Sequence, residues 1–257
     1  PELASRNNRT PKSDYLHNLT ARQAYNYGFS RDLTYYFNGP TGMAMADKFP
    51  SPPAKGASQI SEIIVHKADG FRYAYGLPAK NQRQIDATFS VHPYDTNHAY
   101  NSRSTPTLDV VTLGQRSQHR ASNQYESIKT LPGYAHSWLL THIASTDYQD
   151  QTWDGMTKDD PGSWVKFNYL KTTGETAGEQ YRWREPYVGS AFTDGKKSDY
   201  TDDLAAYVYG EKDLYYLRTA ETATHVALFE VSPRTDALGT NNGSLGGNAG
   251  TGTPNSN

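Results

Sequence analysis

The densest group of side chains capable of chemistry is an acidic segment over residues 147–160. It holds five carboxylates and one glycine, and the carboxylates are Asp147, Asp150, Asp154, Asp159 and Asp160. Calcium takes about six to eight oxygen ligands, and a compact acidic loop supplies several of them. The spacing differs from that of an EF-hand, and Lys158 lies among the acids. Two interpretations stay open: a solvated acidic turn that joins two strands, or a Ca²⁺ loop.

A calcium ion would lock this loop by screening the mutual repulsion of its carboxylates. In that case we expect Asp147, Asp150 and Asp154 to be the main ligands. Asp159 and Asp160 are the next candidates, because they lie at the far end of the same acidic segment.

The other patterns of nucleophiles and metal ligands favour ordinary structural roles. Eight histidines are scattered along the chain, without the His-Glu-x-x-His spacing of a zinc metalloprotease. His66, His142 and His225 fall in expected strands, where we predict sheet residues that make ordinary hydrogen bonds. The sequence has no cysteine, which excludes disulfides and thiol nucleophiles. It also has no Gly-x-Ser-x-Gly nucleophile turn and no phosphate-binding glycine loop.

A glycoside-acting enzyme stays an alternative, because the chain has both carboxylates and aromatic rings near expected strands. The glutamates are Glu185, Glu211, Glu221 and Glu230, and the tryptophans are Trp138, Trp153, Trp164 and Trp183. A glycosidase needs two carboxylates on opposite sides of a cleft, and no spacing in the sequence identifies such a pair. We therefore expect that the chain is not an enzyme.

The charge balance argues against nucleic acid as a partner. Lysine and arginine number 25 against 27 aspartates and glutamates, which leaves no basic excess to neutralise phosphates. In Arg182-Trp183-Arg184, a strand would place the tryptophan on one face and both arginines on the other. We expect Trp183 to pack inward and the arginines to pair with carboxylates outside. We expect no membrane span, because no run approaches the ~18 apolar residues of a membrane helix.

The composition predicts a folded, mostly β chain. Twenty tyrosines and four tryptophans supply buriable surface, and threonine, glycine, asparagine and 14 prolines favour strands and turns. Residues 59–67 and 71–76 resemble two strands, and the intervening Asp69-Gly70 is a strong hairpin signal. Further strands are expected at residues 25–29, 33–37, 85–91, 138–144, 164–170, 180–184, 214–219 and 225–231.

Composition also suggests how the chain is organised. We expect N-terminal strands and a Pro-rich loop (39–57) in residues 1–57, a β-rich core domain at 58–238, and a Gly/Asn-rich linker or tail at 239–257. Residues 93–124 are expected to form a long connection and residues 199–206 a short helical turn.

Because no apolar leader precedes the first segment, either a signal peptide has been removed or the chain is a piece of a longer protein; we favour the second interpretation. The expected fold is all-β: an antiparallel twisted sheet or sandwich with long loops, cut from a larger β shell.

Several tyrosine-rich stretches carry a family resemblance. Residues 64–78 contain a strand, Asp-Gly and Tyr-x-Tyr-Gly, residues 137–143 and 165–169 suggest another hairpin, and residues 181–186, 207–217, 224–229 and 234–239 continue the pattern. Together they resemble large bacterial Rhs/YD-repeat-type secreted or cell-surface proteins. The likeness covers about residues 60–240; the tandem YD repeats and the self-cleaving core of that family are missing. It implies a non-catalytic shell segment, similar to the B and C components of toxin complexes.

Three hypotheses follow. The first is a structural or interaction module of a large secreted or surface-exposed bacterial protein, with other segments of the same polypeptide or a cell-surface partner around it. The second is a calcium-dependent carbohydrate-binding module that uses the acidic loop and exposed Trp or Tyr rings to hold a glycan. The third is a glycoside-acting enzyme.

Overall fold

The computed structural model describes residues 14–39, 42–54, 56–91, 110–111, 126–152, 154–172, 180–186, 190–192, 203–240 and 254–256. In this part of the chain strands predominate and a single helix occurs, which confirms the expected all-β fold. The chain divides into two compact units. The first contains Pro1–Ala79, His136–Lys171 and Tyr215–Glu230, and the second contains Lys80–Ala135, Thr172–Leu214 and Val231–Asn257. Each unit joins segments that are distant in sequence, whereas the expected division at residues 57 and 238 used contiguous ones.

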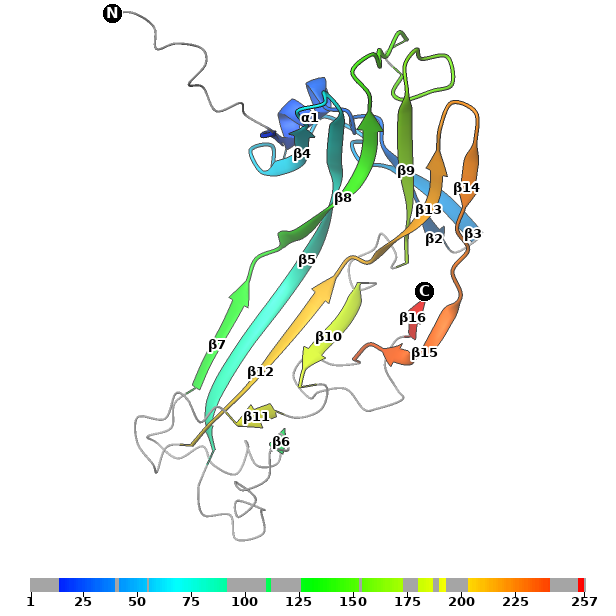
Figure 1. The fold of residues 1–257 in the computed structure, drawn as a ribbon. Coiled ribbons are helices and arrows are strands. Elements are labelled where there is room, and N and C mark those ends of the chain that lie inside the picture. The colour runs from blue at the N-terminus through cyan, green and yellow to red at the C-terminus, as the bar shows by residue number, and fades with distance from the viewer. Residues whose placement is uncertain are drawn as a thin grey trace, which may run out of the picture. The chain divides into compact units, whose positions relative to one another are not determined.

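The first unit is a sheet with a short helix (Figure 1). Its elements are β1 (Tyr15–Thr20), α1 (Ala21–Tyr27), β2 (Thr34–Gly39), β3 (Gly42–Asp47), β4 (Ile60–His66), the start of β5 (Arg72–Val91), most of β8 (Tyr134–Ala144), β9 (Trp164–Lys171), β13 (Tyr215–Glu221) and β14 (Val226–Leu228). The strand order is β1-β4-β5-β8-β9-β13-β14. The β2–β3 hairpin joins β9 by a short parallel pairing, so the sheet is mixed rather than purely antiparallel.

The β4–β5 hairpin forms at the predicted Asp-Gly turn. Gly70 has a φ of +86°, a left-handed conformation that glycine adopts without steric cost. Its N–H donates to the carbonyl of Lys67 over 2.9 Å, and the N–H of Phe71 donates to Asp69 Oδ1 over 3.0 Å. The turn therefore satisfies its own backbone groups and fixes the position of Phe71 at the start of β5.

Apolar packing in the first unit includes two small clusters. One contains Leu19, Ala24, Ile64 and Ala74, and the other contains Ala144, Tyr148, Met156 and Trp164. Phe29, in the turn after α1, packs against both clusters. The aromatic residues thus supply core surface that aliphatic side chains supply in most domains, as the composition suggested.

The second unit is built around the long strand β5. Its other strands are β6 (Val110–Val111), β7 (Glu126–Leu131), β10 (Tyr181–Glu185), β11 (Ser190–Phe192), β12 (Asp203–Lys212), β15 (Pro233–Leu238) and β16 (Pro254–Ser256). β12 is antiparallel to β5, β10 and β11, and β7 is antiparallel to β5. β15 and β16 form a separate two-stranded sheet.

Buried aromatic residues also hold the second unit together. Tyr207 and Tyr209 of β12 are buried, and the Arg184 guanidinium lies 3.8 Å from the centre of the Tyr207 ring. Gly210 leaves room for Trp183 on the paired strand, because a Cβ there would lie 2.4 Å from the indole. The expectation of outward-facing arginines is therefore wrong for Arg184, which burial and ring stacking hold inside.

Three local expectations are wrong. The strand expected at 25–29 overlaps α1, which starts with a capping box between Thr20 and Gln23. The loop expected at 39–57 contains β3, whose alternating Met-Ala pattern pairs with β2. The helical turn expected at 199–206 is strand from Asp203 onward, because ladder pairing to β5 overrides its cap-like residues. Most of the expected connection at 93–124 lies outside the described residues.

No helix among the described residues has both the length and the apolar character needed to cross a lipid bilayer.

The capping box at the start of α1 gives a stability prediction. The Thr20 hydroxyl accepts from Gln23 N over 3.3 Å, and Gln23 Oε1 accepts from Thr20 N over 3.0 Å. We expect Thr20→Ala to lower the free energy of unfolding by about 1 kcal/mol, because a helix N–H loses its acceptor. Thr20→Ser keeps the hydroxyl and should stay close to the parent in urea unfolding. Equal losses in both variants would show that the cap contributes nothing.

Candidate functional site

The acidic segment forms the loop between β8 and β9, and its exposed carboxylates are bonded locally. Asp147 accepts from the Ser145 hydroxyl, Asp154 accepts from the Thr152 hydroxyl, and Asp159 accepts from Thr157 Oγ1. In each case the donor lies two residues earlier in the chain. The hydrogen bond from Ser145 is the main cause that lowers the pKa of Asp147. The hydrogen bond from Thr157 does the same for Asp159.

The other two carboxylates hold the loop together from within. Asp160 is buried and accepts from Gln151 N, Thr157 N and Tyr148 Oη at 3.0 to 3.2 Å. Asp150 accepts from Gly155 N over 3.3 Å. Among the described residues, no three carboxylate or imidazole side chains converge closely enough to share a metal ion. A Ca²⁺ site at Asp147, Asp150, Asp154, Asp159 and Asp160 stays a prediction.

A buried carboxylate on β4 is the centre of a polar network in the first unit. Glu62 has no exposed surface, and its oxygens accept from Phe29 N over 2.9 Å and from Ser30 N over 3.0 Å. Lys48 Nζ lies 3.8 Å from Glu62 Oε2, and its side chain is only 5 % exposed. Glu62 thereby joins β4 to the turn that follows α1 and to the segment that follows β3.

The same turn contacts β8 through a hydroxyl. Ser30 Oγ lies 2.5 Å from Thr141 Oγ1 and 3.2 Å from His142 Nδ1, and Thr141 Oγ1 donates to the carbonyl of Ala74 over 3.0 Å. Gly76 makes room for this contact, because a Cβ there would lie 1.7 Å from Ser30 Oγ. The network therefore connects five separate segments of the first unit through a few polar atoms.

Burial shifts the pKa of each titratable member of this network. It lowers the pKa of Lys48 to about 8, against the opposing attraction of Glu62. It raises the pKa of Glu62, while Lys48 and the two backbone N–H groups partly oppose that change. It lowers the pKa of His142 to about 3, with smaller contributions from the charges of Lys166 and Lys48. His142 is therefore neutral across the physiological range.

A serine hydroxyl beside an imidazole has the atoms of a hydrolytic pair, but this geometry does not suit catalysis. Ser30 has no exposed surface, and His142 is 3 % exposed, so a substrate carbonyl cannot approach either group. In a catalytic triad, the carboxylate accepts from the histidine and orients its ring. Here the Glu62 carboxylate accepts from the backbone N–H of Ser30 instead. The arrangement can hold segments together, and it cannot transfer an acyl group.

Sequence reasoning placed His142 correctly in a hydrogen-bonded strand and missed its partners. Glu62 carried the available signal, because it is the single charged residue in strand 60–65, whose other residues are mostly β-branched and apolar. A charge at that position must be compensated if the strand is buried. Ser30 and Lys48 carried no such signal, since their contacts depend on the path of the chain between strands.

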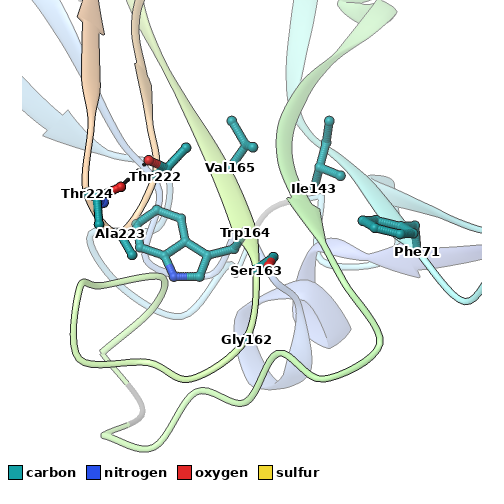
Figure 2. A pocket seen from close by; sticks show the side chains of 9 residues that line it. All are labelled: Phe71, Ile143, Gly162, Ser163, Trp164, Val165, Thr222, Ala223 and Thr224. Carbon is teal, nitrogen blue, oxygen red and sulfur yellow. Dashed lines mark hydrogen bonds between the residues drawn. The ribbon is translucent and has the colours of Figure 1, made fainter.

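An open pocket of about 350 Å³ lies at one end of β8 and β9 in the first unit. Figure 2 shows its lining, with the indole of Trp164 beside the turn 222–224 and the ring of Phe71 at the other end. The lining residues are Phe71, Ile143, Gly162, Ser163, Trp164, Val165, Thr222, Ala223 and Thr224. None of them carries an ionisable side chain.

The described tryptophans do not present open faces for sugar rings. Trp164 is 6 % exposed, and Trp138 and Trp183 are half-buried. Trp153 lies outside the described residues. Two of the glutamates considered for catalysis serve structure, because Glu211 accepts from Tyr209 Oη and Glu221 accepts from Asn168 and Thr219. The arrangement of these side chains favours packing over carbohydrate chemistry.

In the first unit, apolar side chains are exposed along three strands that each have one pairing partner among the described strands. These strands are β14, which pairs with β13, β3, which pairs with β2, and β1, which pairs with β4. Their exposed apolar residues are Val226 and Leu228, Met43 and Met45, and Tyr15 and Leu16, each at least half exposed. Such strands combine unpaired backbone groups with apolar surface, and both suit contact with another chain segment.

Comparisons with known proteins give no relative: no protein-family model, no curated protein and no solved structure matches this chain.

The buried histidine gives a prediction about pH. The unfolded chain protonates His142 near pH 6.5, and the folded chain resists protonation down to about pH 3. Because folding lowers the pKa of His142, the free energy of unfolding decreases as the pH falls below the pKa of the unfolded chain. By pH 5 this decrease should reach about 2 kcal/mol. We expect chemical unfolding at pH 7.5 and pH 5 to show this loss in the parent and a smaller one in His142→Gln.

His225→Gln, at an exposed position outside this network, is measured in parallel as the control. The explanation fails if His142→Gln loses as much stability on acidification as the parent does.

Proposed function

We propose that this chain is a non-catalytic structural or interaction module of a large secreted or surface-exposed bacterial protein. The observation that carries the proposal is the apolar surface on edge strands of the first unit. On β14, Val226 is 67 % exposed, Leu228 is 57 % exposed and the following Phe229 is 43 % exposed. Burying such side chains against a neighbour stabilises an assembly by about 25 cal/mol per Å² of apolar surface.

The arrangement of β14 supports contact on both of its faces. Successive residues of a strand point to opposite sides of the sheet, and all three residues of β14 are exposed. Its inner edge pairs with β13 from Thr219↔Leu228 to Glu221↔Val226. A neighbouring segment that pairs with the outer edge would cover apolar side chains above and below it. The occupant we favour is another segment of the same long polypeptide.

The perturbed ionisable groups support a passive role. Strong pKa shifts in an accessible cleft are typical of catalysis. In this chain the large shifts of Lys48 and His142 belong to side chains enclosed by packing, and the pocket lining carries no ionisable group. A scaffold uses such groups for stability, and a cell-surface or extracellular location agrees with the resemblance to Rhs-type proteins.

Amide hydrogen exchange tests the proposal directly. We expect amides of β14 and β3 to exchange at least about tenfold more slowly in the intact parent polypeptide than in this chain alone, since pairing slows exchange. Val226→Ser with Leu228→Ser should remove that protection. Ile128→Ser removes similar exposed apolar surface from β7 and serves as the matched control, because Ile128 is 52 % exposed.

Two results would overturn the proposal. One is equal exchange of β14 and β3 in the chain and in the parent polypeptide. The other is turnover of a glycoside, or chelator-sensitive binding on a glycan array, by the purified chain, either of which would favour the alternative functions.

A further inference from the structure

The pocket at the end of β8 and β9 has a floor formed by two paired side chains. Ile143 and Val165 are directly opposite each other in the antiparallel β8–β9 ladder, so they point to the same side of the sheet. Both are half-buried, which leaves part of each side chain open to the pocket. The floor is therefore aliphatic and continuous across two strands.

Two turns close the ends of the pocket. Phe71 is 37 % exposed, and the β4–β5 turn fixes its backbone on both sides, because its N–H donates to Asp69 and its carbonyl accepts from Lys67 N. At the other end, the turn 222–224 stands beside Trp164 (Figure 2). The pocket is thus preformed by hydrogen-bonded turns and by strands.

Several polar groups of the lining are bonded within the protein. Thr222 Oγ1 accepts from His225 N over 3.1 Å, and Thr224 Oγ1 bonds to His225 Nδ1 over 2.8 Å. The Ser163 carbonyl accepts from Ser145 N, and the Ser163 N–H donates to Ser145 Oγ. A polar or charged ligand would lose its hydration there without equivalent partners, so the pocket favours an uncharged apolar molecule.

Size and composition narrow the ligand further. Ligand pockets of about 300 to 1,000 Å³ hold small organic molecules, and a cavity of about 150 Å³ holds one benzene ring. The 350 Å³ here accommodates one or two fused rings. Phe71 is 37 % exposed and supplies aromatic surface, which attracts another ring in offset or edge-to-face geometry, whereas the indole of Trp164 is packed in the core cluster.

We propose that this pocket binds a small uncharged aromatic molecule of one or two rings, between Phe71 and the turn 222–224 and above Ile143 and Val165. The bonded backbone groups of Phe71 and Ser163 favour a free small molecule over a peptide, because an extended peptide binds through main-chain hydrogen bonds and these groups already have partners. This site is separate from the proposed scaffold role, which depends on β14, β3 and β1.

Indole is a suitable probe, and isothermal titration calorimetry with ligand-observed NMR measures its binding to the whole chain. We expect a dissociation constant of about 0.1 mM, consistent with the affinity per atom of small ligands. Val165→Phe fills the pocket and should weaken binding at least about tenfold by removing the space for the ring. Phe71→Ala removes one wall and should weaken binding at least about threefold.

The neighbouring strand provides matched controls. Val226→Phe and Phe229→Ala make the same changes at exposed positions outside the lining, and both should bind indole as the parent does. Thermal melting of all four variants checks that each is folded. Indole-3-acetate should bind at least about tenfold more weakly than indole, because its charge finds no partner.

Several outcomes would overturn the inference. They are an absence of indole binding by the folded parent, equal weakening in the two control variants, or indole-3-acetate binding as tightly as indole. Binding of N-acetyl-tryptophanamide with no binding of free indole would instead assign the pocket to a peptide side chain.

Discussion

The burial of the Glu62 carboxylate is the constraint on which the first unit depends. A charged group without exposed surface is costly unless hydrogen bonds and an opposite charge compensate it. Glu62 obtains both, from the N–H groups of Phe29 and Ser30 and from Lys48. Its partners belong to the turn after α1 and to the segment after β3, so satisfying one carboxylate fixes the course of the chain at two places. Glycine at position 28 leaves room for this carboxylate and for the end of α1, since a Cβ there would lie 2.8 Å from Glu62 Oε2 and 2.7 Å from the carbonyl oxygen of Ala24.

The groups that stabilise this chain differ in kind from the groups that it exposes on its surface. Lys48, Glu62 and His142, whose pKa values burial shifts, lie inside the first unit, where their contacts hold segments together. The surface presents apolar side chains on β14, β3 and β1 and an uncharged pocket at the end of β8 and β9. This is the reverse of an active site, in which the shifted groups face a substrate. It agrees with a module whose role is contact.

Local sequence signals predicted much of the strand content, and long-range contacts decided the rest. The Asp69-Gly70 turn and the alternation in β4, β8 and β9 were recognisable because they depend on neighbouring residues. α1 was mistaken for a strand, since its apolar residues fit either period and the capping box at Thr20 and Gln23 was overlooked. The acidic loop was recognised, but composition could not show that Asp160 is buried under its own loop's N–H groups. The pocket was also missed, because its lining comes from three distant segments that only the sheet brings together.

Urea unfolding of Glu62→Gln tests the central claim most directly, with Glu211→Gln in the second unit as the reference. If the buried carboxylate organises the first unit, Glu62→Gln should lower the free energy of unfolding by about 3–5 kcal/mol, because Lys48 is left without its counter-charge. Glu211 is only half-buried, so Glu211→Gln should cost about 1 kcal/mol or less. A loss at Glu62 no larger than the loss at Glu211 would contradict the account.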